Sequence, residues 1–125
     1  MTCYCGDEKN YEACCGRFHS GAELAANAEV LMRSRYSAYV VMQESYLLAT
    51  WHVNTRPQAV DFSDDTKTKW LGLEIKHHRI IDANNAQVEF VARYKTGGQP
   101  VVRLHEISDF IFEEGRWFYV AGVFP

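Results

Sequence analysis

The C-terminal half of the chain reads LGLEIKHHRIID (residues 71–82), AQVEFVARYKT (86–96), PVVRLHEISDFIFE (100–113) and RWFYVAGVF (116–124). Apolar and polar residues alternate along much of these four segments, which is typical of β-strands. Three pairs of turn-forming residues separate the segments: Asn84-Asn85, Gly97-Gly98 and Glu114-Gly115. The pattern predicts an antiparallel meander of four strands, and strands of this length usually bend, so we expect a curved sheet.

Two-residue turns give a trial register for this sheet. One face then carries Leu73, Ile75, Ile81, Val88, Phe90, Tyr94, Ile107, Ile111, Phe118 and Val120. The other face carries Val91, Val102, Leu104, Phe110, Phe112, Trp117, Tyr119 and Val123. Neither face is mainly polar, so both need cover. Helices would bury one face, and the N-terminal segment, the 52–69 loop or a second subunit would bury the other, so we predict a homodimer.

Residues 28–51 contain neither Gly nor Pro and favour helix. Apolar residues recur near a period of 3.6 at Leu31, Ala38, Val41 and Met42. The polar residues 43–45 divide this stretch into two helices, the second over 46–51. Ser20-Gly21-Ala22-Glu23 fits a capping box, and Asn27 is a second candidate N-cap. Residues 52–69 are predicted to form a loop, with a short helix starting at Ser63 or Asp64.

The composition is that of an ordinary globular domain. The chain has 125 residues, of which 47% are hydrophobic and 23% charged, and this length suits one domain with a single core. A formal net charge of −3 argues against a general nucleic-acid binder. No unbroken apolar run is long enough for a membrane span or a signal peptide. We therefore expect a cytoplasmic protein with no membrane partner.

All four cysteines lie near the N-terminus, as Cys3-Tyr4-Cys5 and, after eight further residues, Cys14-Cys15. Four thiolates form a closed tetrahedral site for a structural zinc ion. Gly6 and the polar residues 7–10 suit a loop that brings the second pair back across the metal. The spacing predicts a structural Zn²⁺ site made of Cys3, Cys5, Cys14 and Cys15.

Disulfides are a weaker interpretation of the same cysteines. A bridge between adjacent Cys14 and Cys15 would be strained, and disulfides are typical of secreted chains. A thiol redox sensor is a further alternative, in which Cys14 or Cys15 is reversibly oxidised. Residues 1–19 contain few large apolar side chains, so packing alone would not offset the entropy cost of ordering them. We therefore expect this segment to need a metal.

The cysteine pattern resembles the SEC-C motif, on the residues Cys3-Tyr4-Cys5-Gly6, Tyr11 and Cys14-Cys15-Gly16. This zinc knuckle is best known from the C-terminal tail of the SecA translocation motor, where it docks on the chaperone SecB and on ribosomes. The usual Gly-Ser-Gly after the second cysteine is Gly6-Asp7-Glu8 here, and the final ligand of the motif varies between Cys and His. The resemblance implies a zinc knuckle over residues 1–19 and a protein partner that contacts Tyr4, Tyr11 and loop 7–9.

The rest of the chain resembles the YchJ-like family of uncharacterised bacterial proteins. The similar segments are LMRSRYSAY (31–39), YLLATWH (46–52), VEFVARY (88–94), LHE (104–106) and GRW (115–117). The resemblance implies an α+β fold over residues 20–125, a nuclear-transport-factor-2-like (NTF2-like, or cystatin-like) cone in which two to three helices pack on the curved four-stranded sheet. It also implies a bacterial cytoplasmic protein and no established activity.

Cones of this fold often enclose a pocket, in which acid–base residues could catalyse a reaction such as an isomerisation or a hydration. The trial register places Arg103, His105 and Asp109 on one face, with His77 and Arg79 on the neighbouring strands. It places Arg93, Glu106 and Ser108 on the opposite face near Tyr119. The candidate acid–base residues are therefore His105, Asp109 and Glu106. The alternative is an Arg93–Glu106 ion pair across two strands and a His105 that is exposed or bonded to the backbone.

The remaining polar residues give no catalytic or metal-binding pattern. Arg33 and Arg35 are two residues apart on the predicted helix, so they point in different directions and do not form a joint phosphate clamp. His19 is close enough to replace a cysteine ligand, whereas His52, His77 and His78 follow no ligand spacing. We therefore favour a small zinc-binding protein that binds a protein partner or a small molecule, and we keep an enzyme acting in the cone as the alternative.

Overall fold

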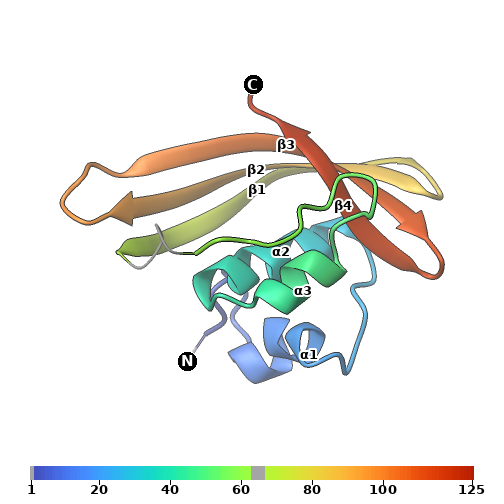
Figure 1. The fold of residues 1–125 in the computed structure, drawn as a ribbon, viewed down its shortest axis with the longest axis horizontal. Helices are drawn as coiled ribbons and strands as arrows, with labels where there is room; N and C mark the ends of the chain where they lie inside the picture. The colour runs from blue at the N-terminus through green and yellow to red at the C-terminus, as the bar shows by residue number, and fades with distance from the viewer. Residues whose placement is uncertain (1, 63–66) are drawn as a thin grey trace.

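The computed structural model describes residues 2–62 and 67–125, which form a four-stranded sheet with helices on one side (Figure 1). The helices in these residues are α1 (Cys15–His19), α2 (Ala28–Val40) and α3 (Glu44–Ala49), and a 3-10 turn covers Tyr11–Ala13. The strands are β1 (Thr68–Asp82), β2 (Asn85–Thr96), β3 (Val102–Glu113) and β4 (Arg116–Val123). Neighbouring strands are antiparallel in the order β1-β2-β3-β4, so the predicted meander is confirmed.

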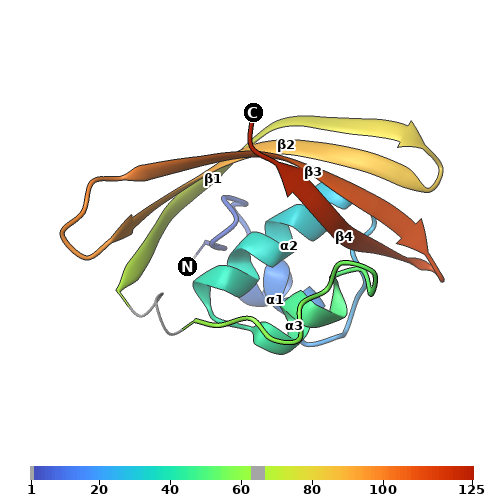
Figure 2. The same ribbon diagram turned by 45° about the horizontal axis from the view of Figure 1, so that its top comes forward.

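The sheet bends into an arch whose concave face covers α2, with α3 on the far side of that helix (Figure 2). The N-terminal loop lies beside α2 and next to β1, where a Cβ on Gly6 would be 3.8 Å from the Leu73 carbonyl oxygen. The pairing of β1 with β2 slips at three places along β1, and that of β3 with β4 slips once. Each slip inserts an unpaired residue, which bends the strand and increases its twist. The arch and the helices beneath it form the expected α+β cone.

Helix α2 lies at the centre of the molecule. Its N-terminus is capped by Asn27, whose side chain accepts a hydrogen bond from the backbone N–H of Val30 over 2.9 Å. Apolar side chains of α2 pack on the sheet in one core, whose buried members are Ala28, Leu31, Met32, Tyr36, Ala86, Val88, Phe90, Ala92 and Phe110. Ser34, Arg35 and Ser37 of the same helix are also buried. The helix is therefore covered on more than one side.

The second candidate N-cap was the correct one, and the capping box at Ser20 is wrong. Ser20 follows the last residue of α1, and its hydroxyl accepts from the backbone N–H of Ala22 over 3.4 Å. The serine side chain therefore forms a local turn. Such a turn and a helix N-cap use the same residue type, so the sequence alone does not distinguish them. The predicted break near residue 43 is confirmed, because α2 and α3 are separated at Val41–Gln43.

The trial register between the second and third strands is wrong by one residue. Tyr94 pairs with Val102 and Val88 with Ser108, so the connection spans residues 97–101 and is longer than a two-residue Gly97-Gly98 turn. A slip of one residue exchanges the faces of a strand. It places Leu104, Glu106 and Phe110 on the concave face, beside Val88 and Phe90. The turn at Glu114-Gly115 is confirmed by the pairing of Glu113 with Arg116.

The opposite, convex face carries Ile107, Ile111 and Phe118, which are half-buried in the single chain. The homodimer over this face stays a prediction. The exposed edge of β4 is shielded by the segment after α3, because His52 N–H donates to Tyr119 O and Tyr119 N–H donates to Thr50 O, each over 2.8 Å. The predicted short helix at Ser63 or Asp64 lies outside the described residues. None of the helices described is long and apolar enough to cross a membrane.

Candidate metal centre and cone cavity

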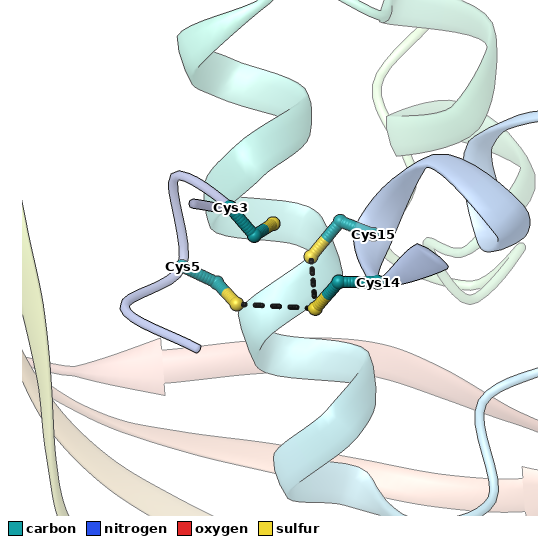
Figure 3. A group of neighbouring side chains, drawn as sticks. All are labelled: Cys3, Cys5, Cys14 and Cys15. Carbon is teal, nitrogen blue, oxygen red and sulfur yellow. Dashed lines mark hydrogen bonds between the residues drawn. The ribbon is translucent and has the colours of Figure 1, made fainter. Parts of the chain in front are cut away.

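The four cysteine sulfurs converge on one point between the N-terminal loop and the start of α1 (Figure 3). All four Sγ atoms lie within 4.8 Å of one another. The Cys5 and Cys14 sulfurs are 3.7 Å apart, and the Cys14 and Cys15 sulfurs are 4.0 Å apart. A tetrahedral ion with Zn–S bonds of about 2.3 Å would hold its sulfurs about 3.8 Å apart. The observed spacing therefore fits a tetrahedral metal ion.

The sulfurs are shielded from solvent and form no disulfide. The cysteines are between 0% and 6% exposed. No disulfide joins them, and all four belong to the described part of the chain. The alternative with bridged cysteines is thus not the state of this structure.

The cluster favours one thiolate and resists a second. A hydrogen bond from Cys15 lowers the pKa of Cys5 to about 5 and outweighs the effect of burial. Burial, together with the hydrogen bond and charge of Cys5, raises the pKa of Cys14 to about 12. Four neighbouring thiolates need a positive partner, which a divalent cation would supply. The donor set could therefore hold a metal ion.

The loop between the two cysteine pairs is closed by backbone hydrogen bonds. Cys3 N–H donates to Lys9 O over 2.8 Å, and Cys14 N–H donates to Tyr11 O over 3.0 Å. Gly6 has a φ of 92°, a conformation that residues with a Cβ rarely adopt. The loop that was expected from Gly6 and the polar residues after it is therefore present.

The knuckle, residues 2–19, is fixed to α2. The side chain of Arg33 donates to the Cys5 carbonyl over 2.8 Å, and Cys15 Sγ lies 3.6 Å from the Arg33 carbonyl. Cys3 Sγ lies 3.7 Å from the hydroxyl of Ser37. His19 is not at the cluster, because its ring bridges the Tyr11 hydroxyl and the Ser34 carbonyl, at 2.6 and 2.8 Å. The knuckle and the cone thus share this helix.

A cavity of about 570 Å³ lies on the other side of α2, under the sheet. This volume is in the range of small-molecule sites, which are mainly apolar with a few placed polar groups. The lining is rich in aromatic side chains: Tyr36, Tyr39, Trp51, Trp70, Phe90, Tyr94 and Tyr119. The charged side chains that line it, among the residues described, are Arg35 and Glu106.

Glu106 is 9% exposed and is oriented by two neighbours. The hydroxyls of Ser108 and Tyr119 both donate to its Oε2 atom, the latter over 3.2 Å. Burial, and then the charge of Glu106, raise the pKa of Tyr119, which keeps the phenol protonated as a donor. Gly122 leaves the room for this carboxyl group, because a Cβ at that position would lie 2.7 Å from Glu106 Cγ. Glu106 is thus a fixed acceptor in the cavity.

Arg35 is 2% exposed. Its Nη1 atom donates to the Leu47 carbonyl over 2.9 Å and to the Thr50 hydroxyl over 2.7 Å. Its guanidinium group lies over the rings of Trp51 and Tyr119, at 5.0 and 4.6 Å from their centroids. These contacts with α3 and the segment after it hold the cation against the wall of the cavity.

Of the three candidate acid–base residues, the structure places only Glu106 at the cavity. His105 and Asp109 lie on the convex face, where His105 Nε2 is 2.7 Å from Glu89 and Asp109 accepts from Gln87 over 2.8 Å. Arg93 also faces away from Glu106, and no ion pair joins these two described residues. The one-residue slip between the second and third strands explains why the trial register grouped them differently.

The other candidates are also separated. Arg33 contacts the knuckle and Arg35 the cavity, so these two arginines do point in different directions as predicted. His52 is buried beside Glu113 at 3.2 Å, and His78 Nδ1 lies 3.9 Å from Glu29. Arg35, Trp51 and Gly122 were not recognisable in the sequence as parts of one site. The available signal was Arg35 itself, because residues 30–40 contain no acidic side chain that could pair with it.

Comparison with known proteins supports both parts of the structure. The family model described as "YchJ, middle NTF2-like domain" matches residues 27–122. A UPF0225 protein of Polaromonas sp. (strain JS666 / ATCC BAA-500) is 54% identical over 90% of this chain and 81% of its own length. A UPF0225 protein of Bordetella pertussis is 51% identical over 96% of this chain and 90% of its own length.

Two solved structures have the same fold. The solution structure of a SEC-C motif containing protein from Rhodopseudomonas palustris has a TM-score of 0.88 and 32% identity, and covers 100% of this chain and 99% of that one. The crystal structure of a SEC-C motif containing protein from Psychrobacter arcticus has a TM-score of 0.82 and 28% identity, and covers 100% and 83%. The likeness extends over the knuckle as well as the cone.

Proposed function

This chain belongs to the YchJ-like family of UPF0225 proteins, and from this premise we propose that it is a small-molecule-binding module stabilised by a structural zinc ion. The ligand would bind in the cavity of the cone. The four cysteines would hold Zn²⁺ as a closed site, without an open position for a reacting water. The observation that supports this proposal is the position of α2, which contacts the knuckle through Arg33 and lines the cavity through Arg35.

This arrangement gives the metal an effect on ligand binding. Ordering the knuckle fixes α2 from one side, and α2 supplies Met32, Arg35, Tyr36 and Tyr39 to the cavity. A wall that is fixed in advance lowers the ordering cost of binding. Loss of zinc is therefore expected to weaken ligand binding without any contact between metal and ligand.

A fragment screen by ligand-observed NMR tests the binding function. Ala92 is 2% exposed and lines the cavity, so Ala92→Phe fills part of it. Ala121 is exposed on the convex side of β4, and Ala121→Phe is the matched control. Compounds that bind the wild type should lose binding to Ala92→Phe and keep it with Ala121→Phe. Compounds that bind all three proteins equally would show that the cavity is not the binding site.

The zinc ion is tested separately by native mass spectrometry of protein purified without chelator. We expect one Zn²⁺ per chain in the wild type and none in a Cys5→Ser, Cys14→Ser double variant. Equal metal content in both proteins would contradict the assignment of the cysteines as ligands.

Docking of a protein partner on the knuckle is a second candidate function, supported by the exposed side chains of Glu8, Lys9 and Asn10. Tyr4 and Tyr11 are less available, because their rings pack edge to face at 5.7 Å and Tyr11 is bonded to His19. The contact surface would therefore be the loop. A pull-down with a Glu8→Ala, Lys9→Ala variant should lose partners that the wild type recovers, and identical recoveries would argue against docking by this loop.

Catalysis in the cavity is the alternative, and it would use Glu106 with Tyr119, a carboxyl and a phenol that are 3.2 Å apart. Such a pair could move a proton on a bound substrate. An enzyme would convert a bound compound, whereas a binding protein returns it unchanged. Mass spectrometry of fragment hits after long incubation separates these two functions.

A further inference from the structure

The polar groups of the cavity restrict the chemistry of a ligand. Arg35 and Glu106 are the charged side chains lining it in the described residues, and they are 2% and 9% exposed. They carry opposite formal charges and are linked through Tyr119, whose ring lies against the guanidinium group and whose hydroxyl donates to the carboxyl group. A cavity that contains both residues in their ionised forms has no net charge.

A charged ligand would give the cavity a net charge. An anion would be attracted by Arg35 but repelled by Glu106, and a cation would meet the reverse. In either case one charge in a poorly hydrated space would have no partner, which is unfavourable. The charges of the cavity therefore fit a neutral ligand.

Glu106 presents one carboxylate oxygen to the cavity without a donor among the described residues. Both donors to Glu106 end on Oε2, and none reaches Oε1. The indole Nε1 of Trp51 also has no partner, but this atom is fully covered by protein and is not open to a ligand. The cavity therefore offers a ligand the acceptor Glu106 Oε1.

The aromatic lining restricts the shape. Seven of the lining residues have aromatic rings, and these walls favour a flat ligand that stacks between or against them. We propose that the cavity binds a neutral, planar heterocycle that donates a hydrogen bond to Glu106. This inference rests on the proposed binding function and adds the ligand class to it.

Four bicyclic probes of similar size test this class. Quinolin-2-one is neutral and offers a ring N–H and a carbonyl, and 1-methylquinolin-2-one lacks the N–H. The 1-methylquinolinium ion and quinoline-2-carboxylate carry the two charges on the same ring system. Binding is followed by the indole N–H signals of Trp51 and Trp70 in ¹H–¹⁵N spectra, and the signal of Trp117, which does not line this cavity, is the internal control.

Quinolin-2-one should bind the wild type about tenfold more tightly than each of the other three probes, from the loss of one hydrogen bond or the addition of one unpaired charge. Glu106→Gln should remove this advantage and strengthen quinoline-2-carboxylate, because Arg35 then lacks its counter-charge. Glu89→Gln, on the convex face beside His105, should change neither the advantage of quinolin-2-one nor the affinity for quinoline-2-carboxylate.

The outcomes separate the ligand class from the binding function. If a charged probe binds the wild-type cavity as tightly as quinolin-2-one, or if Glu106→Gln leaves all four affinities unchanged, the ligand class is wrong and the binding function stands. If no probe shifts the signals of Trp51 and Trp70, and the Ala92→Phe screen also finds no cavity ligand, the binding function fails as well.

Discussion

The side chain of Arg33 donates to the backbone carbonyl of Cys5 over 2.8 Å and so joins the cysteine loop to the central helix. The same side chain donates to Glu29, one turn earlier on the helix, over 3.2 Å. The Arg33 side chain thus pairs with Glu29 on the surface of α2 and also contacts the backbone of the candidate metal site. Two residues later, Arg35 enters the cavity. The contact between Arg33 and Cys5 is therefore where the knuckle and the cone would influence each other.

Replacing Arg33 by Met should weaken the attachment of the knuckle. The substitution removes a hydrogen bond from a charged donor and leaves the Cys5 carbonyl without it, so we expect the free energy of unfolding in urea to fall by about 1–2 kcal/mol. Glu29→Gln is the control, because it removes the half-exposed ion pair with Arg33 and the 3.9 Å approach of His78 but leaves the bond to Cys5, and it should cost about 0.5 kcal/mol or less. Equal losses in the two variants would show that the contact with Cys5 contributes nothing.

Removing the metal should disorder the knuckle and leave the sheet folded. Few large apolar side chains hold residues 2–19, and Phe18 is the one large aromatic side chain of this segment that is fully buried. After treatment with a chelator under reducing conditions, the amide signals of residues 2–19 should collapse to the narrow range of a disordered chain. The signals of β2 and β3 should keep their dispersion. A knuckle that stays ordered without metal would overturn the proposed structural role of zinc.

His19 should titrate below its ordinary pKa of 6.5. Burial lowers the pKa of His19, and the hydrogen bond to the Ser34 carbonyl opposes this only in part. The unfolded chain therefore binds this proton more readily, so the contribution of His19 to stability is complete above pH 6.5 and is lost as the pH falls through the folded-state pKa. The ring is best followed by NMR, because acid would also release a metal bound by the cysteines.

Tyr11→Phe is the informative variant for this titration. The Tyr11 hydroxyl lies 2.6 Å from His19 Nδ1, and a ring with its hydrogen on Nε2 accepts this bond while donating to Ser34. Protonation of Nδ1 would break the bond from Tyr11. Without the hydroxyl, the pKa of His19 should move back toward 6.5. A wild-type titration midpoint at or above 6.5 would contradict the prediction.

The cysteine cluster was predictable because its residues are close in the chain. Cys3, Cys5, Cys14 and Cys15 are separated by a short loop, and their chemistry limits what such a group can do. The strand pattern was equally local, and the order β1-β2-β3-β4 follows from short connections. Asn27, a side chain that caps its own helix, was also identified from its neighbours alone.

The cavity was not predictable in the same way because it depends on register. One additional residue in the connection after Thr96 moves Glu106 to the face of Phe90, and the hydrophobic pattern does not resolve this, since both faces of the sheet are apolar. The pairing of Arg35 with the cavity depends on the crossing of α2 under the arch. Neither the strand register nor the crossing of α2 under the sheet can be read from the spacing of residues along the chain.

Gly122→Ala should disturb the cavity through Glu106. A Cβ at position 122 would lie 2.5 Å from Glu106 Cδ, so the carboxyl group must turn away from Ser108 and Tyr119, and we expect a loss of about 1–3 kcal/mol in the free energy of unfolding. Gly98→Ala meets nothing within 4 Å and should be nearly neutral. In a Glu106→Ala background the carboxyl group is absent, and Gly122→Ala should then cost much less. Equal costs of Gly122→Ala in both backgrounds would show that this glycine is not required by Glu106.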